Sequence, residues 1–90
     1  DGSVKVTFNQ PIDPQSAQTH FELYPTGLFG RQVAGDFLMR ENTLVFTPTT
    51  WLKFDTTYEV TIKAGVTSTA GGAGMTNPYT FRFTTVPLPR

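Results

Sequence analysis

The residues of this chain that could carry chemistry are few, and a single histidine is the first of them. His20 is the only histidine, and the chain contains no cysteine. General acid-base catalysis or activation of a nucleophile would require His20 to lie beside a carboxylate or a hydroxyl group. In "HFELY" the alternation of side chains places His20 opposite the apolar Phe21 and Leu23. The pattern therefore predicts a solvated surface histidine and not a catalytic base.

The acidic residues are spaced singly along the chain. Hydrolysis of a glycosidic bond would need two carboxylates at a suitable separation. Glu22 and Glu59 fall on predicted polar faces in the middle of strands, where carboxylates commonly pair with a neighbouring Lys or are simply solvated. Asp13, Asp36 and Asp55 are assigned to turns, where an Asp side chain usually bonds its own backbone. We therefore predict no catalytic residues, and an enzyme would require such groups to converge in a cleft.

Metal and phosphate sites have little support in the sequence. With one histidine and no cysteine, a zinc site would have to be completed by carboxylates, which is uncommon for structural zinc. The segment "AGGAG" lacks the Lys and Ser or Thr of a phosphate-binding P-loop, and no helix is predicted after it. The loop "TSTAGGAGMTN" offers few charged oxygen ligands for calcium. No cofactor is predicted, and cation binding by the loop at residues 66–78 stays an open alternative.

The charge balance restricts the partners of the chain. Seven basic and seven acidic residues give a net charge of +0, and neither sign forms a run. Binding of nucleic acid or of an anionic membrane surface needs clustered Lys and Arg, so neither is predicted. No apolar stretch has the length of a membrane span, and no signal peptide precedes Asp1. We expect a soluble piece of a larger protein.

Side chains alternate between apolar and polar along most of the chain, which is the pattern of half-buried strands. Short turn-rich segments separate these stretches, and only "DPQSAQ" could begin a helix, with Asp13 as its cap and Pro14 in its first turn. The sequence therefore predicts an all-β fold, an antiparallel sandwich of about seven strands. The expected strands lie in "VKVTF", "HFELY", residues 32–34, residues 36–40, "TLVFTP", "YEVTIKA" and "YTFRFTT".

Longer segments resemble a known family. "VKVTFNQPIDPQSAQTHFELYP" resembles the opening of bacterial Ig-like domains of the S-layer type, and "TLVFTPTTWLKFDTTYEVTIKAGVTSTAGG" is similar to their central motif. "YTFRFTT" is similar to their closing strand, and the ending "FTTVPLPR" also resembles the allied macroglobulin-type Ig-like domains of bacterial alpha-2-macroglobulin-like proteins. The resemblance implies an Ig-like sandwich. The chain departs from the family at Ser68 and Gly71-Gly72, where the family commonly has Asp and Gly-Asn.

Tyr58 has the spacing of a tyrosine corner, because Leu52 precedes it across a polar crossing. In such a corner the ring is buried while the hydroxyl bonds to upstream backbone. The alternative is a plain core aromatic, and either role is structural.

Aromatic residues near turns form the remaining candidates for binding. Trp51, Phe54, Tyr24 and Phe29 are expected near turns or on outward faces, where they could meet sugar rings or a protein neighbour. We interpret Phe54 and Phe29 as caps on the ends of the sandwich. Trp51 and Tyr24 are the candidate binding residues.

The C-terminal "VPLPR" predicts a Pro-rich interdomain linker at residues 86–90, after an Ig-like domain at residues 1–85. The resemblance implies a non-catalytic spacer or docking module of a larger extracellular or cell-envelope protein, partnered by neighbouring domains of the same chain. A macroglobulin-like protease inhibitor is one such parent, although the thioester of those proteins requires a cysteine that is absent here. The alternative function is glycan or ligand binding through exposed aromatics.

Overall fold

The computed structural model describes residues 3–27, 30–69 and 74–87. Within these residues the fold is all-β, with six strands in two antiparallel sheets and one short helix. The predicted class, an antiparallel Ig-like sandwich, is confirmed. The elements are β1 (Val4–Thr7), α1 (Pro14–Thr19), β2 (Phe21–Pro25), β3 (Gly35–Arg40), β4 (Thr43–Pro48), β5 (Thr57–Ile62) and β6 (Tyr79–Thr84).

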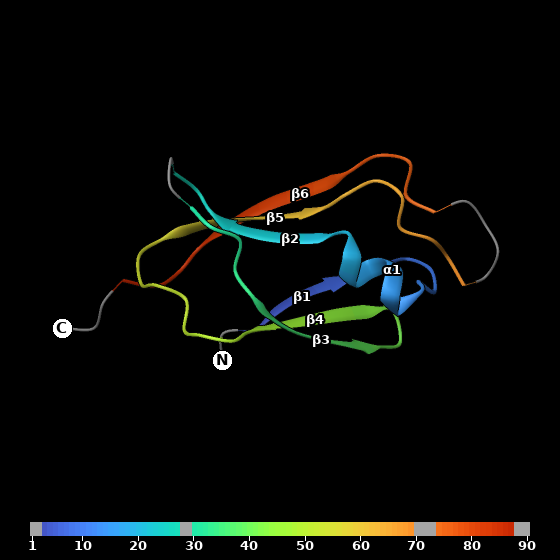
Figure 1. Cartoon of the computed structure of the whole chain (residues 1–90), viewed down its shortest axis with the longest axis horizontal. Coiled ribbons are helices and arrows are strands. Elements are labelled where there is room, and N and C mark those ends of the chain that lie inside the picture. The colour runs from blue at the N-terminus through green and yellow to red at the C-terminus, as the bar shows by residue number, and fades with distance from the viewer. Residues whose placement is uncertain (1–2, 28–29, 70–73, 88–90) are drawn as a thin grey trace.

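The two sheets have the strand orders β1-β4-β3 and β2-β5-β6. Figure 1 shows them stacked, with α1 carrying the chain from β1 in one sheet to β2 in the other. Only β3 and β4, and β5 and β6, are neighbours both in sequence and in a sheet. The outer faces carry cross-strand threonine pairs, such as Thr57 with Thr84 at 2.8 Å between the hydroxyl oxygens.

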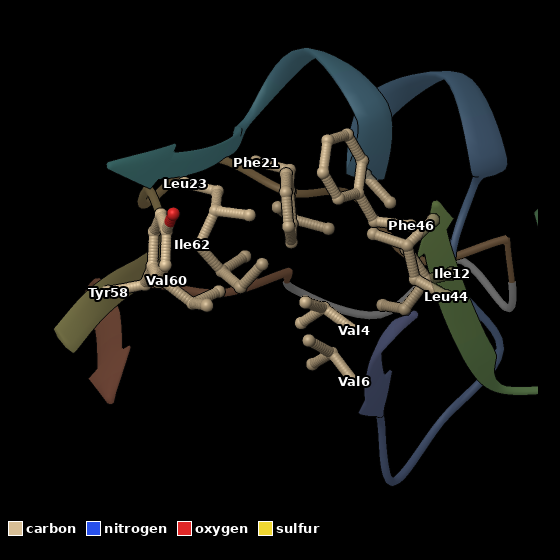
Figure 2. Close-up of a cluster of buried hydrophobic side chains, with 12 residues drawn as sticks. Val4, Val6, Ile12, Phe21, Leu23, Leu44, Phe46, Tyr58, Val60 and Ile62 are labelled. Carbon is tan, nitrogen blue, oxygen red and sulfur yellow. The ribbon is translucent and has the colours of Figure 1, made fainter. Parts of the chain in front are cut away.

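The inner faces of the two sheets form the core. Figure 2 shows the buried side chains filling the space between the sheets. Every apolar position predicted by alternation in β1, β2, β4 and β5 is buried. At the centre, Phe21 of one sheet contacts Phe37 and Phe46 of the other, with ring centroids 5.4 and 4.8 Å apart. Such aromatic pairs add about 0.5–1.5 kcal/mol each beyond the area they bury.

The helix forms where the sequence predicted it. The Asp13 carboxylate accepts a hydrogen bond from the Gln15 backbone N–H at 3.3 Å, and Pro14 occupies the first turn. Ala17 is fully buried, and the helix packs against the core on the side that carries this residue. Since α1 has six residues, its stability comes from this packing more than from helix propensity.

Residues 32–34 do not form the predicted strand. Val33 donates to the Leu23 carbonyl of β2 at 2.8 Å, while the Ala34 carbonyl accepts from Thr49 beside β4 at 2.9 Å. Because these bonds go to different sheets, the segment is an extended crossing and not part of one ladder. The first position of β3 is a glycine, Gly35, because a Cβ there would clash with the Thr47 carbonyl and lie 2.6 Å from the Phe46 ring. The described residues therefore contain six strands, where about seven were predicted.

The N-terminal end of β6 is more exposed than its alternation predicted. The alternation of "YTFRFTT" predicts Tyr79 on the same inner face as Phe81 and Phe83, yet 54% of Tyr79 is exposed. Its strand lies at a sheet edge, and Tyr79 lines an open hollow beside β1 instead of meeting the opposite sheet. The phase of β6 is as predicted, but within the described part of the chain its first residue stays open to solvent.

Tyr58 forms a tyrosine corner. Its hydroxyl accepts a hydrogen bond from the Lys53 backbone N–H at 2.9 Å, while the residue is 3% exposed. The ring stacks on Phe83 with a centroid separation of 5.7 Å. The hydroxyl thus ties the crossing between β4 and β5 to the core, which confirms the corner over the plain core aromatic.

Replacing Tyr58 by Phe should lower the free energy of unfolding by about 1–2 kcal/mol, because the part-buried Lys53 N–H loses its acceptor. Urea and thermal denaturation would measure this loss, with a fall in Tm of about 5–10 °C. Tyr79→Phe is the matched control, since Tyr79 is exposed, and it should change stability by less than about 0.5 kcal/mol. Equal stability of Y58F and the unsubstituted chain would contradict this role of the hydroxyl.

Candidate functional site

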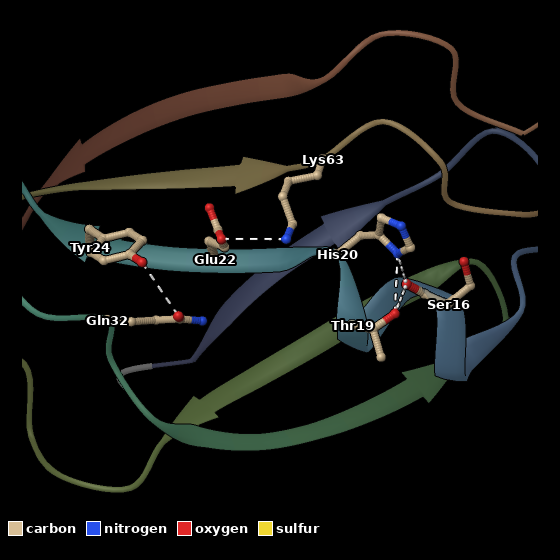
Figure 3. A network of polar contacts seen from close by, with 7 residues as sticks. All are labelled: Ser16, Thr19, His20, Glu22, Tyr24, Gln32 and Lys63. Carbon is tan, nitrogen blue, oxygen red and sulfur yellow. Dashed lines mark hydrogen bonds and ion pairs between the residues drawn. The ribbon is translucent and has the colours of Figure 1, made fainter.

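His20 ends the helix and is held by it. The imidazole Nδ1 lies 2.7 Å from the Ser16 carbonyl oxygen and 3.2 Å from the Thr19 hydroxyl (Figure 3). Since a carbonyl only accepts, Nδ1 carries the proton of the shorter bond. The prediction of a solvated histidine needs correction, because His20 is half-buried and caps the last turn of α1. Its Nε2 faces Gly65, where a Cβ would come within 3.0 Å.

The strand carboxylates are paired, which is one of the two outcomes expected for them. Glu22 lies 3.6 Å from the Lys63 ammonium, and Glu59 lies 3.0 Å from the Arg82 guanidinium. Both pairs are partly solvated, so each contributes at most about 1 kcal/mol to stability. Glu22 of β2 is thus linked to Lys63, the residue after β5, and Glu59 of β5 is linked to Arg82 of β6.

The aspartates follow the turn prediction with one exception. Asp13 caps α1, and Asp55 lies in a turn with φ of 50°. Asp36 was assigned to a turn although it is also the first residue of the strand expected at residues 36–40; it lies in β3, paired with Thr47. Over residues 3–27, 30–69 and 74–87, no group of three His, Cys, Asp or Glu side chains could hold a metal ion.

The loop proposed for a cation is described only in part, since residues 70–73 lie outside the described residues. Ser68 stands where the family commonly has Asp, and its hydroxyl donates to the Pro11 carbonyl at 3.0 Å. The bridge between Ile12 and Ser68 joins this loop to the segment before α1. Ser68 is thus part of the contact between two loops.

Trp51 is the most exposed large hydrophobic side chain among the described residues, with 93% of its surface exposed. It lies in the crossing between β4 and β5, at the rim of an open hollow of about 790 Å³. Arg31, Gln32 and Lys53 contribute polar groups to this hollow. Phe54, predicted as a cap, is 48% exposed and covers the end of the sandwich only partly. Phe29, the other predicted cap, lies outside the described residues.

Tyr24 does not join Trp51 in one aromatic patch. It is on the outer face of β2, and its hydroxyl donates to the Gln32 side-chain oxygen at 3.5 Å (Figure 3). Gln32 lines the hollow beside Trp51, whereas Tyr24 does not. Trp51 and Tyr24 therefore both lie near the segment that contains Gln32, but they are on different surfaces of the domain.

The chain leaves the sandwich next to Trp51. The Thr85 hydroxyl donates to the Lys53 carbonyl at 2.6 Å, and the Val86 carbonyl accepts from Asp55 N–H at 2.8 Å. We call this end, formed by residues 49–56 and 85–87, the exit pole. The opposite end, which carries α1 and the turn between β3 and β4, is the helix pole (Figure 1).

Sequence reasoning missed a second hollow, of about 690 Å³, between β1 and β6. Its lining includes Val6, Phe8, Ile62, Met75 and Phe81. Alternation assigned most of these residues to the inner face, but it carries no information on which strands face each other across an open side. Only the sheet topology, with β1 and β6 both at edges, exposes this hollow.

Two stacked antiparallel sheets with a tyrosine corner at the start of β5 define an Ig-like sandwich. In agreement with this class, the sequence profile of the family described as "Bacterial Ig-like domain" matches residues 1–85, and the chain belongs to that family. A search of curated proteins found no match to the chain. The helix of the described residues is too short to cross a membrane.

Proposed function

We propose that the chain is a non-catalytic spacer module of a larger bacterial surface or secreted protein. The observation that carries this proposal is the way the last strand is fastened at the exit pole. Thr85 bonds the carbonyls of Lys53 and Thr56, and Val86 bonds Asp55. A pulling force on the C-terminal end is therefore transmitted first to the β5–β6 ladder and the tyrosine corner, and only then to any loosely held segment.

The use of the polar residues supports a non-catalytic role. His20 caps α1, while Glu22 and Glu59 pair with basic side chains. These groups hold the fold together and do not converge on one cleft. Membership of the bacterial Ig-like family supports the same assignment, since its domains are generally structural modules.

The proposed location is extracellular or in the cell envelope, because domains of this family occur in bacterial surface proteins. The proposed partners are neighbouring domains of the same chain, or another surface protein. Balanced charge argues against binding of nucleic acid and of an anionic membrane surface.

Two kinds of parent fit the resemblance: an S-layer-type protein and a macroglobulin-like protease inhibitor. In a macroglobulin-like inhibitor, this module would be one structural domain of the shell that encloses the protease. A different domain would supply the thioester cysteine, since this chain has none. Flanking copies of "TLVFTP" and "TTYEVTI" would favour a repeat array. A downstream Cys-containing thioester motif would favour the inhibitor.

The spacer role predicts a defined distance between adjacent modules. Two copies joined through residues 86–90, each with Thr50→Cys as the sole cysteine, can be spin-labelled cleanly. Electron–electron resonance should give a narrow distance distribution, because Pro87 and Pro89 favour an extended linker. The same tandem with both prolines changed to Gly is the control, and its distribution should broaden. A native linker as broad as the glycine linker would contradict a fixed spacer.

The alternative is glycan binding at Trp51, which its 93% exposure beside an open hollow with polar groups from Arg31, Gln32 and Lys53 supports. Trp51 is the single tryptophan, so intrinsic fluorescence reports on this position alone. The spacer proposal predicts no saturable change on titration with soluble cell-wall polysaccharides. Saturable quenching, with binding by calorimetry that is lost in W51A and kept in Y24A, would replace the spacer by a binding module.

A further inference from the structure

The end of β6 is fastened by a side chain at a place where a backbone group normally serves. In a regular antiparallel ladder, Thr56 and Thr85 would exchange two bonds between their backbone N–H and C=O groups. The bond from the Thr85 N–H to the Thr56 carbonyl is present at 2.9 Å. The Thr56 N–H, however, bonds the Thr85 hydroxyl oxygen, also at 2.9 Å. This hydroxyl therefore extends the ladder of β5 and β6 by one residue pair.

The same hydroxyl reaches the tyrosine corner through Lys53. A hydroxyl has one proton, and that of Thr85 goes to the Lys53 carbonyl at 2.6 Å, while the Thr56 carbonyl lies farther away at 3.2 Å. Lys53 also donates its N–H to the Tyr58 hydroxyl at 2.9 Å. Lys53 thus holds the corner with its N–H and the end of β6 with its carbonyl.

The surroundings of these bonds make them costly to break. Thr85 is half-buried, and the bonds donated by the Lys53 and Thr56 N–H groups are partly shielded from solvent. A shielded donor that loses its acceptor costs more free energy than an exposed one, because water does not replace the acceptor freely. The hydroxyl pair of Thr57 and Thr84, one residue away, is exposed by comparison.

The position of β6 in its sheet makes its end the place where opening would begin. β6 is an edge strand whose single partner is β5. From its C-terminal end, the first bonds to open are those of Val86 with Asp55 and of Thr85 with Thr56. Because the Thr85 hydroxyl is also bonded to Lys53, this first step acts on the residue that anchors the tyrosine corner.

We propose that the Thr85 hydroxyl is a latch that makes the release of β6 and the opening of the tyrosine corner one cooperative step. With the latch closed, β6 does not fray from its end, and the domain keeps its length under load until the corner itself opens. Without the latch, the last residues of β6 open alone while the corner stays closed. This inference deepens the proposed spacer function and rests on it for the load at the C-terminal end.

The first test replaces Thr85 by Val, which has nearly the same shape and no hydroxyl. Amide hydrogen exchange by NMR at Asp55, Thr56 and residue 85 should become about tenfold faster, because the end of β6 then opens alone. These rates are taken relative to the amide of Val60, which is fully buried in the middle of β5 and reports global opening.

Two variants control this test. Thr85→Ser keeps the hydroxyl and should retain the slow exchange at the end of β6. Thr84→Val removes the exposed hydroxyl pair of the neighbouring residue, and it should change the same rates by less than about twofold. Exchange that is unchanged in Thr85→Val, or equally fast in Thr84→Val, would overturn the proposal.

The second test addresses the coupling itself. Tyr58→Phe removes the acceptor of the Lys53 N–H but keeps the ring that stacks on Phe83. Because one step opens both sites, this substitution should speed exchange at Thr85 about as much as at Lys53, relative to the global rate. When Thr85→Val is also present, Tyr58→Phe should speed exchange at Lys53 alone. Acceleration confined to Lys53 in the chain that keeps Thr85 would contradict the latch.

The latch and the spacer can fail separately. A narrow distance in the tandem with uncoupled exchange would keep the spacer and reject the latch. A broad tandem distance with coupled exchange would reject the fixed spacer and keep the latch as a property of the single domain.

Discussion

The contact between the two inner sheet faces is the constraint on which the rest of this domain depends. Phe21 of β2 meets Phe37 and Phe46 of the other sheet, and aliphatic side chains surround this centre (Figure 2). With no cysteine, the domain has no disulfide to supplement a small core. The contact between these aromatic rings must therefore provide much of the free energy that holds the two sheets together. It also determines which residues of each strand face solvent.

The placement of polar groups follows from that constraint. Once one face of each strand is buried, charged residues have only the outer faces and the poles. Glu22 and Glu59 accordingly pair with Lys63 and Arg82, and His20 serves the end of α1. The most exposed aromatic side chain among the described residues, Trp51, lies at the exit pole, beside the segment where the chain leaves the sandwich. An exposed aromatic residue and a fastened chain end at one pole of the domain fit the proposed position between neighbouring domains.

Local pattern predicted most of this fold. Alternation identified the inner faces of β1, β2, β4 and β5 because the period of a strand is a property of a few consecutive residues. The cap at Asp13 and the corner at Tyr58 were predictable because each depends on a short spacing. The predicted strand at residues 32–34 was wrong because those residues bond two different sheets.

The exposure of Tyr79 and the open hollow between β1 and β6 depend on long-range topology. Whether an inward-facing side chain is covered depends on which strand lies opposite, and no local pattern specifies that. The half-burial of His20 was missed for a related reason, since the strand phase of "HFELY" was extended one residue into the end of a helix. The separation of Tyr24 from Trp51 likewise follows from the course of residues 30–34.

The most direct test of the central claim is a double-mutant cycle on Phe21→Leu and Phe46→Leu, with unfolding free energies from urea denaturation. We predict a coupling of about 0.5–1.5 kcal/mol between these two rings, which lie 4.8 Å apart across the sheets. The control cycle pairs Phe21→Leu with Phe83→Leu, whose ring stacks on Tyr58, and should be additive within about 0.5 kcal/mol. Coupling between Phe21 and Phe46 no larger than in the control would contradict the claim that this aromatic contact joins the sheets.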